Sequence, residues 1–116
     1  MCHLLIIEDE WLIAEYLTYL AEQAGATSIA TACTEDEAVE AARQRTPDII
    51  FSDVKLLVGT GPGAVQTIFS ALGEIPVIFI TATPEACQPC EPPGVVLHKP
   101  VDPARVIDAF RRLAPA

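Results

Sequence analysis

Short apolar runs alternate along the chain with segments in which hydrophobic residues recur at helical spacing. Residues 4–7 form a continuously apolar run, which is typical of a strand buried on both faces of a parallel sheet. Over residues 11–24, apolar side chains recur three and four positions apart, and Gly25 follows as a stop signal. The pattern therefore predicts a buried strand followed by an amphipathic helix.

The same alternation continues along the rest of the chain. Further strands are predicted at residues 28–32, 48–53, 77–80 and 95–97. Further helices are predicted over about 34–45, over about 64–72 and from 103 onwards. Thr34 and Glu37 have the spacing of a capping box, and Asp102 followed by Pro103 is typical of a helix start. Alternation of this kind implies right-handed βαβ units, so we expect one α/β domain over residues 1–116, with a parallel five-stranded sheet and helices on both faces.

The segment after the fourth predicted strand departs from this pattern because it is rich in proline. Its prolines are Pro84, Pro89, Pro92 and Pro93. Pro84 is tolerated at a helix start, whereas Pro89 inside a helix would cost about 3 kcal/mol. We therefore expect the fourth helix to be short or absent, reduced to one turn or a loop.

Charge and composition narrow the classes of function. The chain of 116 residues is 51% hydrophobic and 20% charged, with 7 basic and 16 acidic residues and a formal net charge of −9. This charge would repel a phosphate backbone, so we expect no nucleic-acid partner, whereas basic proteins and divalent cations suit an acidic surface. No apolar stretch is long enough for a membrane span, and the N-terminus lacks the features of a signal peptide. We therefore expect no membrane contact and a cytoplasmic location.

Polar and charged residues stand at the ends of four predicted strands. They are Glu8 and Asp9 after the first, Asp53 at the third, Thr81 at the fourth and Lys99 at the fifth. Ligands of parallel sheets lie at the carboxyl ends of the strands, so these side chains are expected to converge on one edge. Three neighbouring carboxylates need a cation, and hard oxygen ligands of this kind suit Mg²⁺. We therefore predict a Mg²⁺ site, beside which Lys99 and Thr81 would hold the oxygens of a phosphoryl group on Asp53.

Four motifs, in order along the chain, resemble those of the CheY-like receiver domains of two-component response regulators. They are the acidic pair in IIEDE, the aspartate in IIFSDVKL, the threonine in VIFITAT and the lysine in VLHKP. The resemblance covers essentially the whole chain and implies a flavodoxin-like (βα)5 fold. It also implies that Asp53 is the phosphoacceptor, which takes its phosphoryl group from a phosphohistidine on a partner kinase.

The resemblance further assigns roles to the other residues at the strand ends. The implied Mg²⁺ ligands are Glu8, Asp9, Asp53 and the backbone carbonyl of Lys55. Thr81 would follow the phosphoryl group inward, and Lys99 would neutralise its charge. The Lys99–Pro100 peptide bond is often cis in this family, which would turn the lysine into the site.

Two regions depart from the receiver pattern. Where the family commonly has Tyr or Phe, three residues before the lysine, this chain has Val96. Because Val96 cannot make the inward motion of an aromatic side chain, switching would run through Thr81 and the loop after it. Residues 76–83 resemble a variant of the PFxFATG motif of alphaproteobacterial stress-response receivers. The departures from that motif include Val77 and Ile80.

The primary hypothesis is a stand-alone, monomeric response regulator that a histidine kinase or phosphotransfer protein phosphorylates on Asp53. It would act on a downstream protein partner or relay phosphate, with no enzymatic chemistry beyond self-phosphorylation and self-dephosphorylation. A second hypothesis is a pseudo-receiver, a binding module that keeps the acidic cluster without phosphotransfer. A third is a thiol oxidoreductase, because Cys87 and Cys90 have the spacing of a redox pair.

Overall fold

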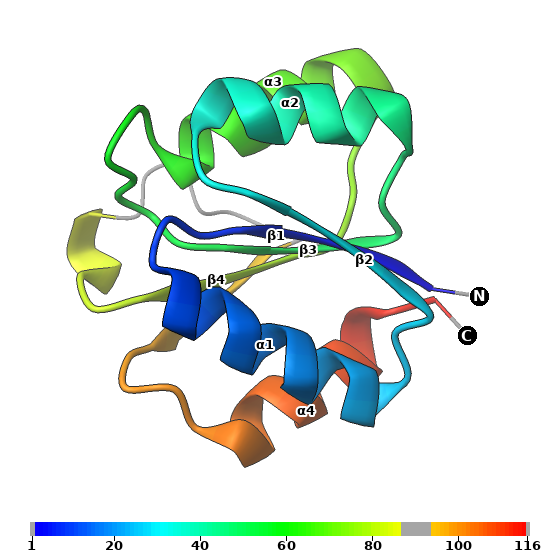
Figure 1. Ribbon diagram of the computed structural model, residues 1–116, viewed down its shortest axis with the longest axis vertical. Helices are drawn as coiled ribbons and strands as arrows, with labels where there is room; N and C mark the ends of the chain where they lie inside the picture. The colour runs from blue at the N-terminus through cyan, green and yellow to red at the C-terminus, as the bar shows by residue number, and fades with distance from the viewer. Residues whose placement is uncertain (1, 87–93, 116) are drawn as a thin grey trace.

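A five-stranded parallel sheet forms the centre of the molecule in the computed structural model, which describes residues 2–86 and 94–115 (Figure 1). The strands are β1 His3–Ile7, β2 Ser28–Ala32, β3 Ile49–Ser52, β4 Val77–Thr81 and β5 Gly94–His98. The helices are α1 Trp11–Ala24, α2 Glu35–Gln44, α3 Gly61–Leu72 and α4 Pro103–Leu113, with a short 3₁₀ helix, η1, at Pro84–Ala86. None of these described helices is long and apolar enough to cross a membrane.

The strands lie in the order β2-β1-β3-β4-β5, and all neighbouring pairs are parallel. Helices α1 and α4 cover one face of the sheet, and α2 and α3 cover the other (Figure 1). This is the flavodoxin-like fold predicted from the sequence. The order of strands reverses between β1 and β3, and a ligand site is expected at the carboxyl ends of these two strands.

Residues of β1, β3 and β4 alternate between two cores, one on each face of the sheet. In β1, Leu4 and Ile6 belong to the core under α1 and α4, whereas Leu5 and Ile7 belong to the core under α2 and α3. All four side chains are buried. The run is continuously apolar because both faces of this strand are covered by helices.

Most predicted boundaries agree with the structure, and one predicted helix start is wrong. Helix α1 has its predicted bounds and ends at Gly25, which adopts a φ of 118°. Helix α3 begins at Gly61 rather than near residue 64. The Thr60 side chain accepts a hydrogen bond from the Gly63 amide, and Pro62 is tolerated in the first turn because its missing N–H needs no partner there.

The start of α2 is close to the predicted capping box. The Thr34 hydroxyl accepts a hydrogen bond from the Glu37 amide at 3.1 Å. The Glu37 carboxylate accepts one in return from the amide of Cys33, one residue before the cap, at 2.9 Å. Two amide groups at the helix start are thereby satisfied.

The segment after β4 contains one helical turn in its described part, as the prolines predict. Pro84 begins η1, which is three residues long. The other three prolines of this segment, and with them Cys87 and Cys90, lie outside the described residues. The thiol hypothesis is therefore not tested by the structure.

Core packing of α4 against the sheet depends on an aromatic pair. The rings of Phe51 in β3 and Phe110 in α4 are buried, with centroids 5.9 Å apart and planes at 85°. We predict that Phe110→Ala lowers the free energy of unfolding by about 3–5 kcal/mol, because it leaves a cavity between α4 and the sheet. Urea denaturation followed by circular dichroism measures the change.

Arg111→Ala is the matched control, since Arg111 is the next residue of α4 and is exposed. Its effect should stay within about 0.5 kcal/mol. Equal denaturation midpoints for the two variants would contradict the packing described for Phe110.

Candidate functional site

Two pairs of neighbouring strands bring the predicted acids together. Ile7 of β1 pairs with Ser52 of β3, so Glu8 and Asp53 follow at adjacent positions of the sheet edge. The Asp53 amide donates to the Ile7 carbonyl at 2.9 Å, and the Glu8 amide donates to a carbonyl at the end of β2 at 2.9 Å. Backbone hydrogen bonds of the sheet thus fix both acidic residues where their strands end.

Three carboxylates gather at this edge. One oxygen each from Glu8, Asp9 and Asp53 lie within 4.8 Å of one another. Only 1% of the Glu8 side chain and 11% of the Asp53 side chain are exposed, so their mutual repulsion is poorly screened by water. This set of hard, convergent oxygen donors fits a small divalent cation such as Mg²⁺.

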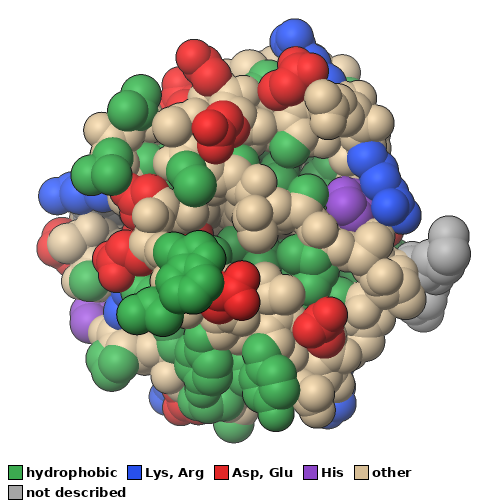
Figure 2. Space-filling model, in the orientation of Figure 1, with side chains coloured by type: hydrophobic (Ala, Val, Ile, Leu, Met, Phe, Trp, Pro, Cys, Tyr) green, Lys and Arg blue, Asp and Glu red, His purple; other side chains and the backbone are tan. Residues whose placement is uncertain are grey.

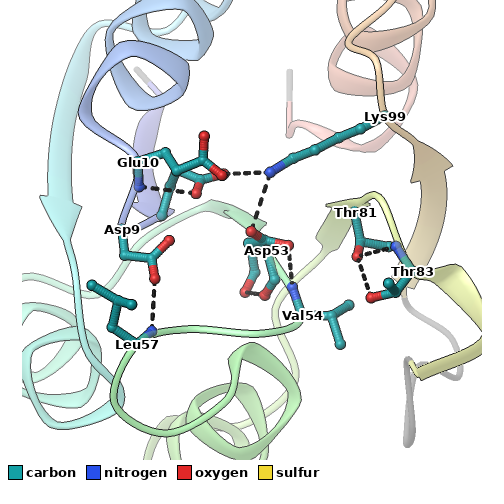
Figure 3. A network of polar contacts seen from close by, with 10 residues as sticks. Asp9, Glu10, Asp53, Val54, Leu57, Thr81, Thr83 and Lys99 are labelled. Atoms are coloured by element: carbon teal, nitrogen blue, oxygen red, sulfur yellow. Dashed lines mark hydrogen bonds and ion pairs between the residues drawn. The ribbon is translucent and has the colours of Figure 1, made fainter.

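Lys99 brings a positive charge to the cluster from the end of β5. Its amide donates to the Thr81 carbonyl at 2.8 Å, and the Lys99–Pro100 peptide bond is cis. The ammonium group lies 3.2 Å from Glu8 Oε1 and 3.1 Å from Asp53 Oδ2 (Figure 3). Lys99 therefore bridges two carboxylates that come from different strands.

The balance of burial and charge is seen in the pKa values of this group. Burial raises the pKa of Glu8 from 4.5 to about 7, against the lowering effects of the Glu10 amide and Lys99. Burial by itself would lower the pKa of Lys99, but attraction to Glu8 and Asp53 outweighs it, so the net pKa is raised. Lys99 consequently keeps its charge, while Glu8 changes charge near neutral pH.

Backbone amides hold the other carboxylate oxygens. Asp53 Oδ1 accepts a hydrogen bond from the amide of Val54 at 2.7 Å. Asp9 Oδ2 accepts one from the amide of Leu57 at 2.6 Å, across the mouth of the site (Figure 3). The loop between β3 and α3 is thereby tied to the acid that follows β1.

Thr81 is buried at the end of β4, and its hydroxyl is directed toward the following loop. Thr81 Oγ1 accepts a hydrogen bond from the Thr83 amide at 3.0 Å and lies 3.3 Å from the Thr83 hydroxyl. Figure 3 shows Thr81 beside Asp53, without a hydrogen bond between the two side chains. Thr81 thus lies near Asp53, the predicted phosphoacceptor, but its hydroxyl contacts Thr83 instead.

Lys55 lies in the β3–α3 loop and is exposed. Its backbone forms an isolated antiparallel bridge with Thr60. The role of its carbonyl as a Mg²⁺ ligand remains a prediction, as do the roles of the other predicted site residues.

Comparison with known proteins identifies the family. The model of the response regulator receiver domain matches residues 4–111. The chain belongs to this family. The four motifs therefore led to the correct family from sequence.

Two PhyR proteins and a chemotaxis protein, CheY4, are similar to this receiver domain. The phyllosphere-induced regulator PhyR of Methylorubrum extorquens is 42% identical over 107 residues, which cover 89% of this chain and 40% of PhyR. The receiver domain of PhyR from Erythrobacter litoralis superposes with a TM-score of 0.86 at 32% identity, covering 99% of this chain and 95% of that one. CheY4 of Vibrio cholerae superposes with a TM-score of 0.84 at 23% identity, covering 97% and 98%, which shows a shared fold.

The similarity to the M. extorquens PhyR covers only part of that protein. The receiver domain described here spans less than half the length of the PhyR of M. extorquens. Placement in the PFxFATG subfamily remains a prediction.

Sequence reasoning missed the backbone donors of the receiver site. The amides of Val54, Leu57 and Glu10 each donate to a site carboxylate. Every residue except proline carries such an amide, so residue type gives no signal of this role. Thr83, whose hydroxyl lies beside that of Thr81, could have been found from the sequence, because it is the last residue of the VIFITAT motif.

The raised pKa of Glu8 makes a prediction about stability in metal-free protein. Between pH 4.5 and pH 7 the unfolded chain releases the Glu8 proton, whereas the folded protein keeps it. Folding is therefore favoured at the lower pH, and this contribution disappears as pH rises through 7. Relative to Glu8→Gln, we expect the free energy of unfolding to fall by about 3 kcal/mol across this interval.

Urea denaturation in the presence of a chelator, at several pH values, measures this difference. Glu10→Gln is the matched control, because Glu10 is the exposed neighbouring acid, and this variant should follow the natural chain. If Glu8→Gln had the same pH dependence as the natural chain, Glu8 would not be the group that titrates.

Proposed function

We propose that this receiver domain is a switch that accepts a phosphoryl group on Asp53 in a Mg²⁺-dependent reaction. The observation that carries the proposal is the position of Asp53. Its carboxylate lies at the end of β3, next to two other acids and 3.1 Å from the Lys99 ammonium. In this proposal the donor is a phosphohistidine of a histidine kinase or phosphotransfer protein, so the switch would act in the cytoplasm.

The residues that would hold Mg²⁺ are Glu8, Asp9, Asp53 and the carbonyl of Lys55. When bound, the ion would neutralise charge on the oxygens of the phosphoryl group during transfer. An Asp53 carboxylate oxygen forms a bond to phosphorus as the bond from phosphorus to the histidine nitrogen breaks. Lys99, already held beside Asp53 Oδ2, stabilises the charge on the transferred group without needing to move far.

The proposed output begins at Thr81. Phosphorylation replaces the single negative charge of Asp53 by nearly two and adds oxygen acceptors. The Thr81 hydroxyl would turn from Thr83 and donate to one of these oxygens, which frees the loop that carries Thr83. Val96, a partly exposed residue of β5, would take no part in this motion, so the change would spread through the loop after β4.

An apolar surface on α1 suits a protein partner. Trp11 and Leu12 are 71% and 72% exposed, and Tyr16 and Tyr19 are also exposed. Figure 2 shows hydrophobic side chains gathered on the face of the molecule that α1 forms. Helix α1 contains acidic but no basic residues, so a partner surface that is basic and apolar would complement it.

Intact-mass measurement with acetyl phosphate and Mg²⁺ tests the proposal. We expect one phosphoryl adduct on the natural chain, and none on Asp53→Ala or when Mg²⁺ is omitted. Lys99→Ala should form the adduct about a hundredfold more slowly, because a charged group aimed at the phosphoryl oxygens is lost. Arg111→Ala, at an exposed site away from the cluster, is the matched control and should react like the natural chain.

No adduct with acetyl phosphate or with candidate kinases would reject the switch. The alternative is then a pseudo-receiver, a binding module that uses the same fold without phosphotransfer. A Mg²⁺ titration followed by Trp11 fluorescence separates the two further, because absence of Mg²⁺ binding is expected only for the module.

The surface on α1 makes a separate prediction. With a kinase that phosphorylates the natural chain, Trp11→Ala should slow transfer about tenfold, because an exposed aromatic anchor is lost. Its reaction with acetyl phosphate should be unchanged, since that small donor needs no docking surface. Glu22→Gln, on the exposed side of the same helix, is the control. Equal slowing with both donors would place Trp11 in the chemistry instead.

A further inference from the structure

The glycine-rich segment from Gly59 to Gly63 wraps around the side chain of Glu35, at the start of α2. Glu35 Oε1 accepts a hydrogen bond from the Thr60 amide at 3.2 Å, and the Glu35 amide donates to the Val58 carbonyl at 3.3 Å. Figure 1 shows the β3–α3 loop beside the N-terminal end of α2. Glu35 therefore contacts the loop through both its side chain and its backbone.

Two glycines make room for this carboxylate. A Cβ at Gly59 would lie 2.6 Å from the Glu35 Cβ, and a Cβ at Gly63 would lie 2.3 Å from Glu35 Oε1. Both distances are too short for atoms that are not bonded to each other. The loop thus approaches Glu35 closely only because side chains are absent at these positions.

The same loop supplies groups to the site. The Leu57 amide donates to Asp9 Oδ2 at 2.6 Å, and Lys55 pairs with Thr60, the residue that Glu35 holds. Glu35 therefore acts on one end of a short loop whose other end contacts the acid cluster. Within the described part of the chain, its hydrogen bonds go to Thr60 and Val58 and not to the carboxylates of the cluster.

We infer that Glu35 is a positioning residue, which fixes the β3–α3 loop so that the Leu57 amide and the Lys55 carbonyl are ready for Mg²⁺ at the acid cluster. This inference rests on the Mg²⁺ site of the proposed function. It gives a role to the glycine-rich segment, which lacks the lysine-serine pair of a phosphate-binding loop. Loss of the Glu35 carboxylate lets the loop move, and both groups then leave their places together.

An ordinary role for Glu35 would be to place negative charge at the N-terminus of α2. Asp36 provides the matched comparison, because it lies in the same first turn and is exposed. A helix-dipole effect would be shared by the two acids, whereas control of the loop belongs to Glu35 alone. Glu35→Gln keeps an oxygen acceptor for the Thr60 amide, so it should keep most of the loop's order and most of the affinity for Mg²⁺.

The test measures two quantities by NMR on the full chain. Hydrogen exchange of the Leu57 amide is measured without metal, and the dissociation constant for Mg²⁺ is obtained from amide shifts during titration with the metal alone. For Glu35→Ala we expect both the exchange rate and the dissociation constant to rise about tenfold, the effect of losing a hydrogen bond to a charged group. Asp36→Ala should change each by less than about twofold, and Glu35→Gln by less than about threefold.

Gly63→Ala is a second variant that leaves the carboxylate in the chain but pushes it aside. It should raise both quantities in the same direction as Glu35→Ala. The inference is overturned if Glu35→Ala and Asp36→Ala give the same values, or if the natural chain does not bind Mg²⁺. If the natural chain binds Mg²⁺ but forms no phosphoryl adduct, the proposed function fails, and these measurements still decide the role of Glu35.

Discussion

The site depends on one ammonium group shared by the buried carboxylate of Glu8 and the half-buried carboxylate of Asp53. Lys99 follows β5, the strand at one edge of the sheet. Its ammonium group lies 3.2 Å from Glu8 Oε1 and 3.1 Å from Asp53 Oδ2. Without it, two poorly solvated negative charges would face each other at the ends of β1 and β3, which is strongly unfavourable. The fold meets this constraint because β4 and β5 continue the sheet beyond β3, and the chain that leaves β5 places Lys99 beside the two carboxylates. Any cation that enters must share these carboxylates with Lys99.

Much of the fold was predictable because burial on both faces of a sheet leaves a clear pattern. The apolar runs of β1 and β4 and the periodicity of α1 identified their elements, and the proline content of the segment after β4 predicted its short helix. The start of α3 was missed by three residues, because glycine and proline suggested a loop. Thr60 provides a cap there, and the same glycines serve contacts with Glu35 that no local pattern reveals.

The site was predictable to the extent that its residues follow strands. Parallel strands end at one edge, so Glu8, Asp53 and Lys99 could be brought together from sequence alone. The backbone donors could not, since the amide of Leu57 is no different in sequence from any other. The orientation of Thr81 toward Thr83 was also beyond prediction, because a hydroxyl rotor is set by its neighbours in three dimensions.

In the proposed switch Asp53 carries the phosphoryl group as an acyl phosphate, which chemical trapping can detect at the residue itself. Borohydride reduces an acyl phosphate on an aspartate to homoserine, which peptide mapping locates along the chain. After treatment with a phosphodonor and Mg²⁺, we expect homoserine at position 53 and nowhere else, and none when Mg²⁺ is withheld. Homoserine at another aspartate, or none at all on a chain that carries the adduct, would contradict it.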